Sequence, residues 1–248
     1  MNRRDAPLAG PPTFAGLFFT TLGTLMYEVL LTRIFSVTMW YHFAFVAVSV
    51  ALFGMTVGAL IVHLLPKFFA GRRLADQLAL STLLFSLTMV ASFIVHLHIE
   101  FQPAWSLSGI GLSALTYLVI SVPFVFSGIA VSLTLTRFVA QVSRLYAIDL
   151  AGAALGATGL VWLLNVTKDG PSAVLAVASM AAVGSLCYAA VAGRRLELAG
   201  AATIAVLALA GLAWGNADAA RHENAFLRIV HVKGAAEGRP LYETWNAF

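Results

Sequence analysis

The chain has 248 residues, of which 60% are hydrophobic and only 10% are charged. An average soluble domain carries about 25% charged residues, and a soluble fold of this size could not hide so much apolar surface, so an ordinary soluble domain is excluded. The net charge of +4 comes from Lys and Arg that flank apolar stretches, which excludes the clustered basic face of a nucleic-acid-binding protein.

Seven apolar stretches are long enough, or nearly so, to cross a hydrocarbon core of about 30 Å, which takes about 20 helical residues. In chain order they cover residues 14–37, 42–65, 78–96, 107–137, 144–164, 173–191 and 198–214. Turn-forming residues such as Pro66 and Gly170-Pro171 separate them. The predicted fold class is an all-α integral membrane protein, with a transmembrane helical domain over residues 1–215.

The fourth stretch carries Pro123 inside its span. Proline frees one backbone carbonyl and bends a membrane helix without ending it. We expect a helix kink at Pro123, and the alternative is a broken helix that forms a binding site.

Residues 216–248 form a predicted soluble tail with equal numbers of acidic and basic residues. Residues 226–232 alternate between apolar and polar side chains, which predicts a strand. A turn over residues 234–240 and a second strand from residue 241 complete a β-hairpin-like tail. Because a lone hairpin is only marginally stable in water, we expect this tail to be the start of a truncated or missing domain.

Basic residues gather in alternate loops. The N-terminal arm and the loops after the second, fourth and sixth stretches hold nine of them, whereas the opposite loops hold only Lys168. The positive-inside rule therefore predicts a multi-pass protein with its N-terminus in the cytoplasm and its tail outside.

The sequence predicts no metal, no cofactor and no catalytic residue in this chain. Cys187 is the only cysteine, which excludes an intrachain disulfide and a cysteine-based metal site. His96, His98 and Glu100 lie two residues apart, a spacing that does not bring side chains together on a helix.

Ionisable residues inside the predicted spans are candidates for substrate binding, because burying a charge in lipid is costly. Glu28 and Asp149 are the two carboxylates of this kind, and a carboxylate in a low-dielectric site attracts a cation strongly. The side chains expected to assist them are Tyr27, Arg33, Arg144 and Tyr146. The alternative is a structural role, in which ion pairs lock the helices together.

Two GxxxG motifs predict close helix packing. One pairs Gly54 with Gly58, and the other pairs Gly152 with Gly156. Shifted by 98 positions the two segments also match at neighbouring Leu and Ala residues, and their helices run in opposite directions in the predicted topology. This favours a 3+3 inverted repeat, as in transporters, and the alternative is a chance match between apolar helices.

Three stretches carry a resemblance to a known family. They are residues 27–33 (YEVLLTR), 143–157 (SRLYAIDLAGAALGA) and 241–248 (LYETWNAF). Together with the Gly54–Gly58 helix, they resemble the membrane part of bacterial membrane-fused spermidine-synthase-like proteins. In that family a multi-helix region precedes a Rossmann-like domain similar to aminopropyltransferases and methyltransferases.

The resemblance implies a bundle of the bacterial inner membrane that anchors an attached domain and binds or passes a polyamine-like or lipid-like small molecule. The catalytic domain is absent from this chain, so no transferase activity is expected of it. Two alternatives remain: a structural or accessory subunit of a larger membrane complex, and a small transporter. The expected partners are the lipid bilayer and either further copies of the chain or that larger complex.

Overall fold

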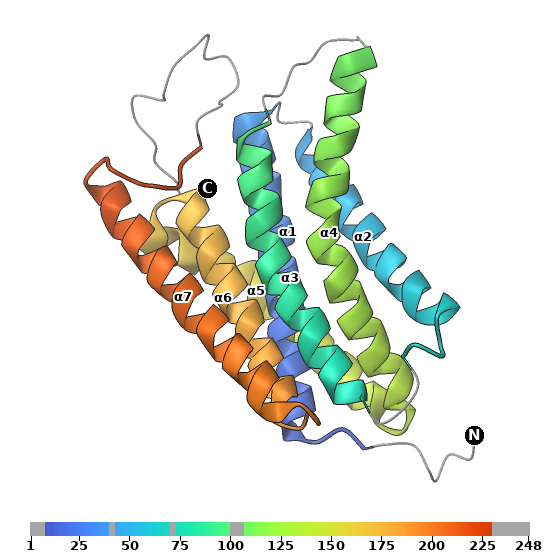
Figure 1. The fold of residues 1–248 in the computed structure, drawn as a ribbon. Coiled ribbons are helices and arrows are strands. Elements are labelled where there is room, and N and C mark those ends of the chain that lie inside the picture. The colour runs from blue at the N-terminus through green and yellow to red at the C-terminus, as the bar shows by residue number, and fades with distance from the viewer. Residues whose placement is uncertain (1–7, 40–42, 70–72, 100–106, 230–248) are drawn as a thin grey trace.

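The computed structural model describes residues 8–39, 43–69, 73–99 and 107–229, and Figure 1 shows their path. Within these ranges the chain forms seven α-helices, one short 3-10 helix and no strand, so the all-α prediction is confirmed. The helices are α1 (Pro11–Thr38), α2 (Ala44–Leu64), α3 (Leu74–Leu97), α4 (Leu107–Arg137), η3 (Val139–Gln141), α5 (Val142–Thr167), α6 (Gly170–Ala189) and α7 (Arg195–Arg221).

All seven α-helices are long and apolar enough to cross a membrane, and each corresponds to one of the predicted stretches. By the length and composition of its helices, the chain is a multi-pass membrane protein. Most helices are longer than predicted, and α7 continues to Arg221 instead of ending at Trp214. Hydropathy marks only the part of a helix that lies in hydrocarbon, whereas the backbone hydrogen bonds continue into polar sequence.

Local sequence explains the sharp turn between α5 and α6. Lys168 takes a left-handed conformation (φ 59°) just after α5, which ends a helix by turning the chain away from its axis. Asp169 then caps α6, because its carboxylate accepts the backbone N–H of Ser172 at 2.7 Å. Pro171 in the first turn of α6 suits a helix start, where no N–H is needed.

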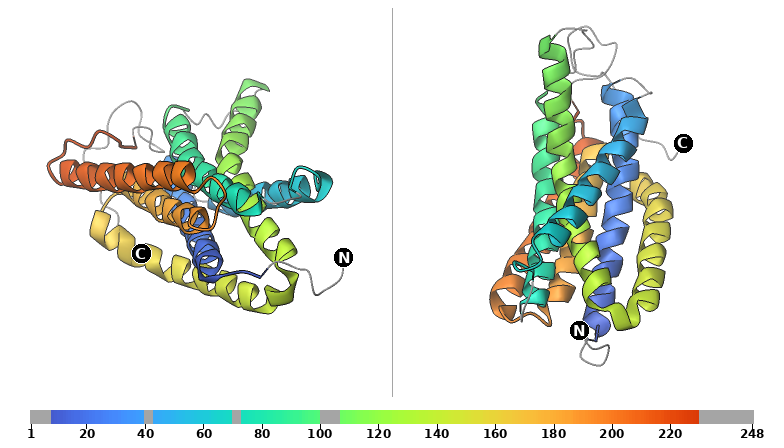
Figure 2. Two further views of the ribbon diagram at one scale, coloured as in Figure 1. Left: turned by 60° about the horizontal axis from the view of Figure 1, so that its bottom comes forward. Right: turned by 90° about the vertical axis from the view of Figure 1, so that its right-hand side faces the viewer.

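Helix α1 occupies the middle of the bundle. It packs against α2, α4, α5 and α6, whereas α5 packs almost entirely against α1. Helix α3 lies between α4 and α6, and α7 covers α6. Figures 1 and 2 show the resulting arrangement, in which α2, α5 and α7 lie at the periphery.

The peripheral helices turn large apolar side chains outward. Phe45 of α2, Trp162 of α5 and Ile204 of α7 are 78%, 66% and 70% exposed. An apolar surface of this extent would be unfavourable in water but is the natural surface of a helix in lipid. It is consistent with contact between these helices and the bilayer.

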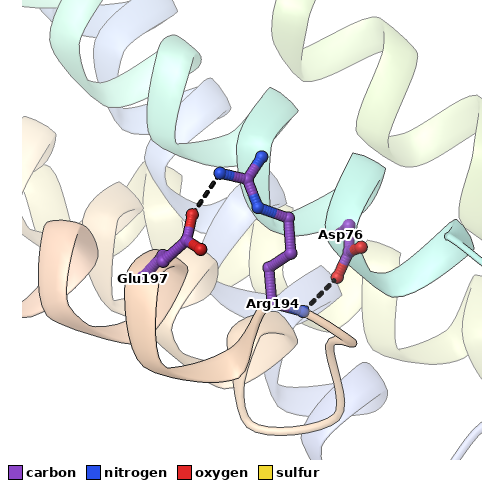
Figure 3. A network of polar contacts seen from close by, with 3 residues as sticks. All are labelled: Asp76, Arg194 and Glu197. Carbon is purple, nitrogen blue, oxygen red and sulfur yellow. Dashed lines mark hydrogen bonds and ion pairs between the residues drawn. The ribbon is translucent and has the colours of Figure 1, made fainter.

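A polar network joins two turns at one end of the bundle (Figure 3). The Asp76 carboxylate at the start of α3 accepts the backbone N–H of Arg194 at 3.1 Å. The Arg194 guanidinium pairs with Glu197 in the first turn of α7. Both partners of this ion pair are largely exposed, so it adds little stability, and the network mainly fixes the α6–α7 turn against α3.

The predicted hairpin is not seen in the described part of the tail. Residues 222–229 follow α7 without forming a strand, and the rest of that prediction, from residue 230, lies outside the described residues. So does the third stretch of the family resemblance, residues 241–248. Helix α4 runs unbroken through Pro123, so a broken, site-forming helix is not observed.

Candidate functional site

The two carboxylates singled out in the sequence are half-buried. Glu28 lies on α1 and Asp149 on α5. Within the described residues neither makes a hydrogen bond or an ion pair with another side chain. The expected helix-locking ion pairs of Glu28 and Asp149 are therefore not formed there.

The structure does not bring Glu28 and Asp149 together. Helices α1 and α5 meet where Gly152 lies against Phe18 and Leu22. Asp149 precedes Gly152 by three residues, and Glu28 follows Phe18 by ten. At 1.5 Å per residue the two carboxylates are about 20 Å apart along the bundle, so they would serve different sites.

The residues expected to assist the carboxylates are also dispersed. Tyr27 is fully buried, stacks on Phe124 with ring centroids 5.4 Å apart, and lies 3.3 Å from the Ser92 hydroxyl. These contacts make Tyr27 part of the packing between α1, α3 and α4. The others are Arg33, half-buried on α1, and Arg144 and Tyr146, which are exposed in the first turns of α5.

Buried hydroxyl groups connect the central helices, and the sequence analysis did not identify them. The Thr24 hydroxyl of α1 hydrogen-bonds to the Ser127 hydroxyl of α4. Thr134 of α4 lies 3.2 Å from the Tyr188 hydroxyl of α6. Such bonds hold membrane helices together, because lipid offers no other partner. A Thr or Ser on the inward face of an apolar helix is the sequence feature that could have indicated such bonds. The sequence does not show which of these residues face each other.

Two matching hydrogen bonds join helices α3 and α6. The Ser86 hydroxyl of α3 donates to the Ala178 carbonyl of α6 at 2.7 Å. The Ser185 hydroxyl of α6 donates to the Ala79 carbonyl of α3, also at 2.7 Å. All four residues are buried.

The first GxxxG motif lies where α2 meets α4. A Cβ atom added at Gly54 would lie 2.6 Å from the Ser121 carbonyl oxygen, and one at Gly58 would overlap the Val125 carbonyl oxygen. The two backbones can approach this closely only because both positions lack a side chain.

The second GxxxG motif lies where α5 meets α1. A Cβ atom added at Gly152 would lie 2.6 Å from the Phe18 carbonyl oxygen, and one at Gly156 would lie 2.6 Å from the Leu22 carbonyl oxygen. Each motif thus packs against a helix that is distant in sequence. Helix α2 packs against α4, and α5 packs against α1.

A polar cluster holds the segment that follows α7. Asn216 is fully buried, and its side chain accepts the Leu227 N–H at 2.8 Å and donates to the Leu227 carbonyl at 3.0 Å. It also donates to the Ser172 hydroxyl at 2.9 Å. Ile229 is 2% exposed and packs into the core, so residues 222–229 are fixed to the end of the bundle.

Asp169 lies in the same cluster, between the spans of α5 and α6. Burial raises the pKa of its carboxyl, although hydrogen bonds from Ser172 and Asn216 oppose the shift. One carboxyl oxygen, Oδ2, is buried and has no hydrogen-bond partner among the described residues. Across the same residues no group of three or more His, Cys, Asp and Glu side chains could hold a metal ion.

No family model, no curated protein and no solved structure matches the chain. The resemblance to spermidine-synthase-like membrane proteins therefore stays a prediction.

Proposed function

We propose that this bundle is a transporter-like membrane protein built from two inverted three-helix repeats, α1–α3 and α4–α6, which carries a small molecule across the bilayer. Transporters of this architecture bind their substrate between the repeats and expose it alternately to the two sides. Three sets of contacts support the proposal, and each relates positions in one repeat to equivalent positions in the other.

The glycine contacts relate α2 to α5 and α4 to α1. Gly54 and Gly152 are 98 positions apart, and each packs against a carbonyl oxygen and the backbone nitrogen four residues later. For Gly54 those residues are Ser121 and Val125, and for Gly152 they are Phe18 and Leu22. The partners are 103 positions apart in both cases, so α4 corresponds to α1 as α5 corresponds to α2.

The serine contacts relate α3 to α6. Ser86 and Ser185 are 99 positions apart, and so are Ala79 and Ala178, the residues whose carbonyls they bond. A two-fold rotation that exchanges α3 and α6 would convert one hydrogen bond into the other.

The contact between Thr24 and Ser127 carries the proposal. These residues are also 103 positions apart, so they are counterparts in α1 and α4, and they hydrogen-bond to each other. Two residues that a two-fold rotation exchanges can touch only beside its axis. Because α1 and α4 run in opposite directions (Figure 1), such an axis would lie in the plane of the membrane, as in inverted repeats.

The repeats would exchange their first helices. Helix α1 packs against α5 and α6, and α4 packs against α2 and α3. Two half-bundles result, and α3 and α6 join them through the serine contacts. Movement of one half-bundle against the other would give a central site access to each side in turn.

Thiol labelling at the axis tests this function. A Thr24→Cys variant in a Cys187→Ala background carries one thiol, at a position that is 6% exposed. We expect a membrane-impermeant maleimide to label it slowly from either side, in right-side-out and in inside-out vesicles. Ile204→Cys, which faces outward on α7, is the control and should be labelled from neither side. A folded Thr24→Cys protein that resists the reagent on both sides would contradict transport.

Anchoring of a soluble domain is a second candidate, which the family resemblance implies and the Asn216 contacts favour. Both backbone groups of Leu227 are held by one buried side chain, so the chain leaves the bundle from a fixed point. We expect Asn216→Ala to expose the bond after Arg228 to trypsin at least about tenfold faster, because loss of both bonds to Leu227 favours local unfolding. Ser179→Ala, which removes one bond between α6 and α7, should leave the cleavage rate unchanged. Equal cleavage of the two variants would remove the support for anchoring.

A further inference from the structure

When the two repeats of the proposed function are superposed, Asp149 in the second repeat falls on a position that is buried in the first. Residue 149 corresponds to Ala51, 98 positions earlier, and Ala51 is fully buried. The neighbouring pair, Ala47 and Leu145, is fully buried in both repeats. Only the second repeat leaves this inward-facing position half-exposed, and there the residue is a carboxylate.

The two repeats also differ in how tightly their first two helices pack. Contacts between α1 and α2 are more extensive than those between α4 and α5. The first repeat is therefore closed and the second more open. In an inverted-repeat protein, exchanging these two conformations gives the opposite state, in which α4 closes on α5 and residue 149 becomes buried as Ala51 is now.

The Asp149 carboxylate forms no ion pair among the described residues. Helix α1 has no ionisable side chain between Pro11 and Met26. The titratable side chains at this level of α6 are Cys187 and Tyr188. Tyr188 lies close enough to Asp149 for the two side chains to interact electrostatically. The charged residues of the packed helices nearest this end of the bundle are Arg137 of α4, Arg144 of α5, and Arg195 and Glu197 of α7.

Burying an unpaired carboxylate in a low-dielectric site is strongly unfavourable, whereas burying a neutralised one is much less so. We infer that a cation bound at Asp149 controls the change between the two states, because α4 can close on α5 only when this carboxylate is neutralised. A proton, an alkali cation and an organic ammonium share the required chemistry. This inference rests on the proposed inverted repeat.

Distances between spin labels on the paired helices test the inference. One pair, Leu135→Cys with Leu150→Cys, reports on α4 and α5. Its counterpart pair, Thr32→Cys with Leu52→Cys, reports on α1 and α2, and all variants carry Cys187→Ala. At high pH without alkali cations we expect a long α4–α5 distance and a short α1–α2 distance. Asp149→Asn should raise the population with the reverse pattern by about tenfold or more.

The matched control is Asp218→Asn, which neutralises an exposed carboxylate on α7, a helix outside the proposed repeats, and should change neither distance. Three additions to the protein with native Asp149 identify the cation: a lower pH at constant salt, NaCl in place of choline chloride, and a short diamine. If Asp149→Asn does not fold, these additions test the inference in its place. At least one of them should shift the populations toward the reverse distance pattern, as Asp149→Asn is expected to do.

The outcomes separate the inference from the proposed function. Two populations that respond to neither Asp149→Asn nor any of the three cations would overturn the inference and leave the inverted repeat standing. An equal response to Asp218→Asn would overturn it as well, because the effect would not be specific to Asp149. A single distance for each pair under all conditions would overturn the inference, and the absence of labelling at Thr24 as well would overturn the proposed function.

Discussion

At the scale of single residues, hydroxyl groups rather than charges connect the helices. Thr24, Ser86 and Ser185 each bond across a helix interface, whereas Glu28 and Asp149 make no such contact among the described residues. Interhelical hydrogen bonds in membranes contribute about 0.6 kcal/mol on average. Bonds of this strength stabilise a bundle and still allow its helices to move.

Asp169 should make stability depend on pH. Burial raises the pKa of its carboxyl above the unfolded value of about 3.9, so its stabilising contribution is fully present below that value and is lost as the pH rises through the folded pKa. We expect the free energy of unfolding in detergent to fall with rising pH over this range. Asp169→Asn, which keeps the helix cap, should flatten the dependence.

Asp169→Ala separates the charge from the cap. It should also flatten the pH dependence, but leave the protein about 1 kcal/mol less stable than Asp169→Asn at every pH, because the N–H of Ser172 loses its acceptor. Unfolding curves that keep the native slope in both variants would show that another group is responsible.

The sequence identifies residue types at this scale but not their neighbours. Glu28 and Asp149 are visible as charges within apolar stretches, yet nothing in the sequence shows that they lie about 20 Å apart. Asn216 and Ser127 look like ordinary polar residues until the fold places Leu227 and Thr24 beside them. A polar residue in a helix acquires its role from the residue it faces, and that depends on helix packing.

At the scale of helices, the glycine motifs decide which helices touch. Gly156→Leu should lower the free energy of unfolding by about 1–3 kcal/mol, because its side chain would overlap the Leu22 backbone on α1. Gly159→Leu on the same helix is the matched control, since no atom lies within 4 Å of a Cβ added there. Thermal or denaturant unfolding in a mild detergent measures both.

The counterpart substitution Gly58→Leu should cost a similar amount, because α2 packs on α4 as α5 packs on α1. If Gly156→Leu and Gly159→Leu destabilise equally, the loss reflects helix propensity or detergent contact, and the packing role of the motif is wrong.

Helix number and order could be predicted from the sequence, because each span must satisfy its backbone hydrogen bonds internally and be apolar for about 20 residues. Helix ends could not, as α7 shows by continuing to Arg221. The alternation in residues 226–232 predicted a strand, but in the described part of this range Leu227 instead bonds the side chain of Asn216. A strand needs a partner strand, and the described chain offers a helix side chain in its place.

At the scale of the whole molecule, the seventh helix sets where the tail emerges. Six helices would return the chain to the side on which it began, and α7 adds one further crossing. It packs mainly on α6 and has no counterpart in the proposed repeats. A domain attached after the tail would therefore lie across the membrane from the N-terminus.

Single-cysteine labelling in intact cells tests this arrangement. In a Cys187→Ala background, Lys67→Cys marks the turn between α2 and α3, and Glu223→Cys marks the segment after α7, both at exposed positions. We expect an impermeant maleimide to label residue 223 in intact cells and residue 67 only after the membrane is opened, because basic loops stay in the cytoplasm. Labelling of both residues under the same condition would mean that one helix does not cross. The tail would then emerge on the side of the N-terminus, where a domain that depends on a cytoplasmic cofactor could work, and anchoring would gain support over transport.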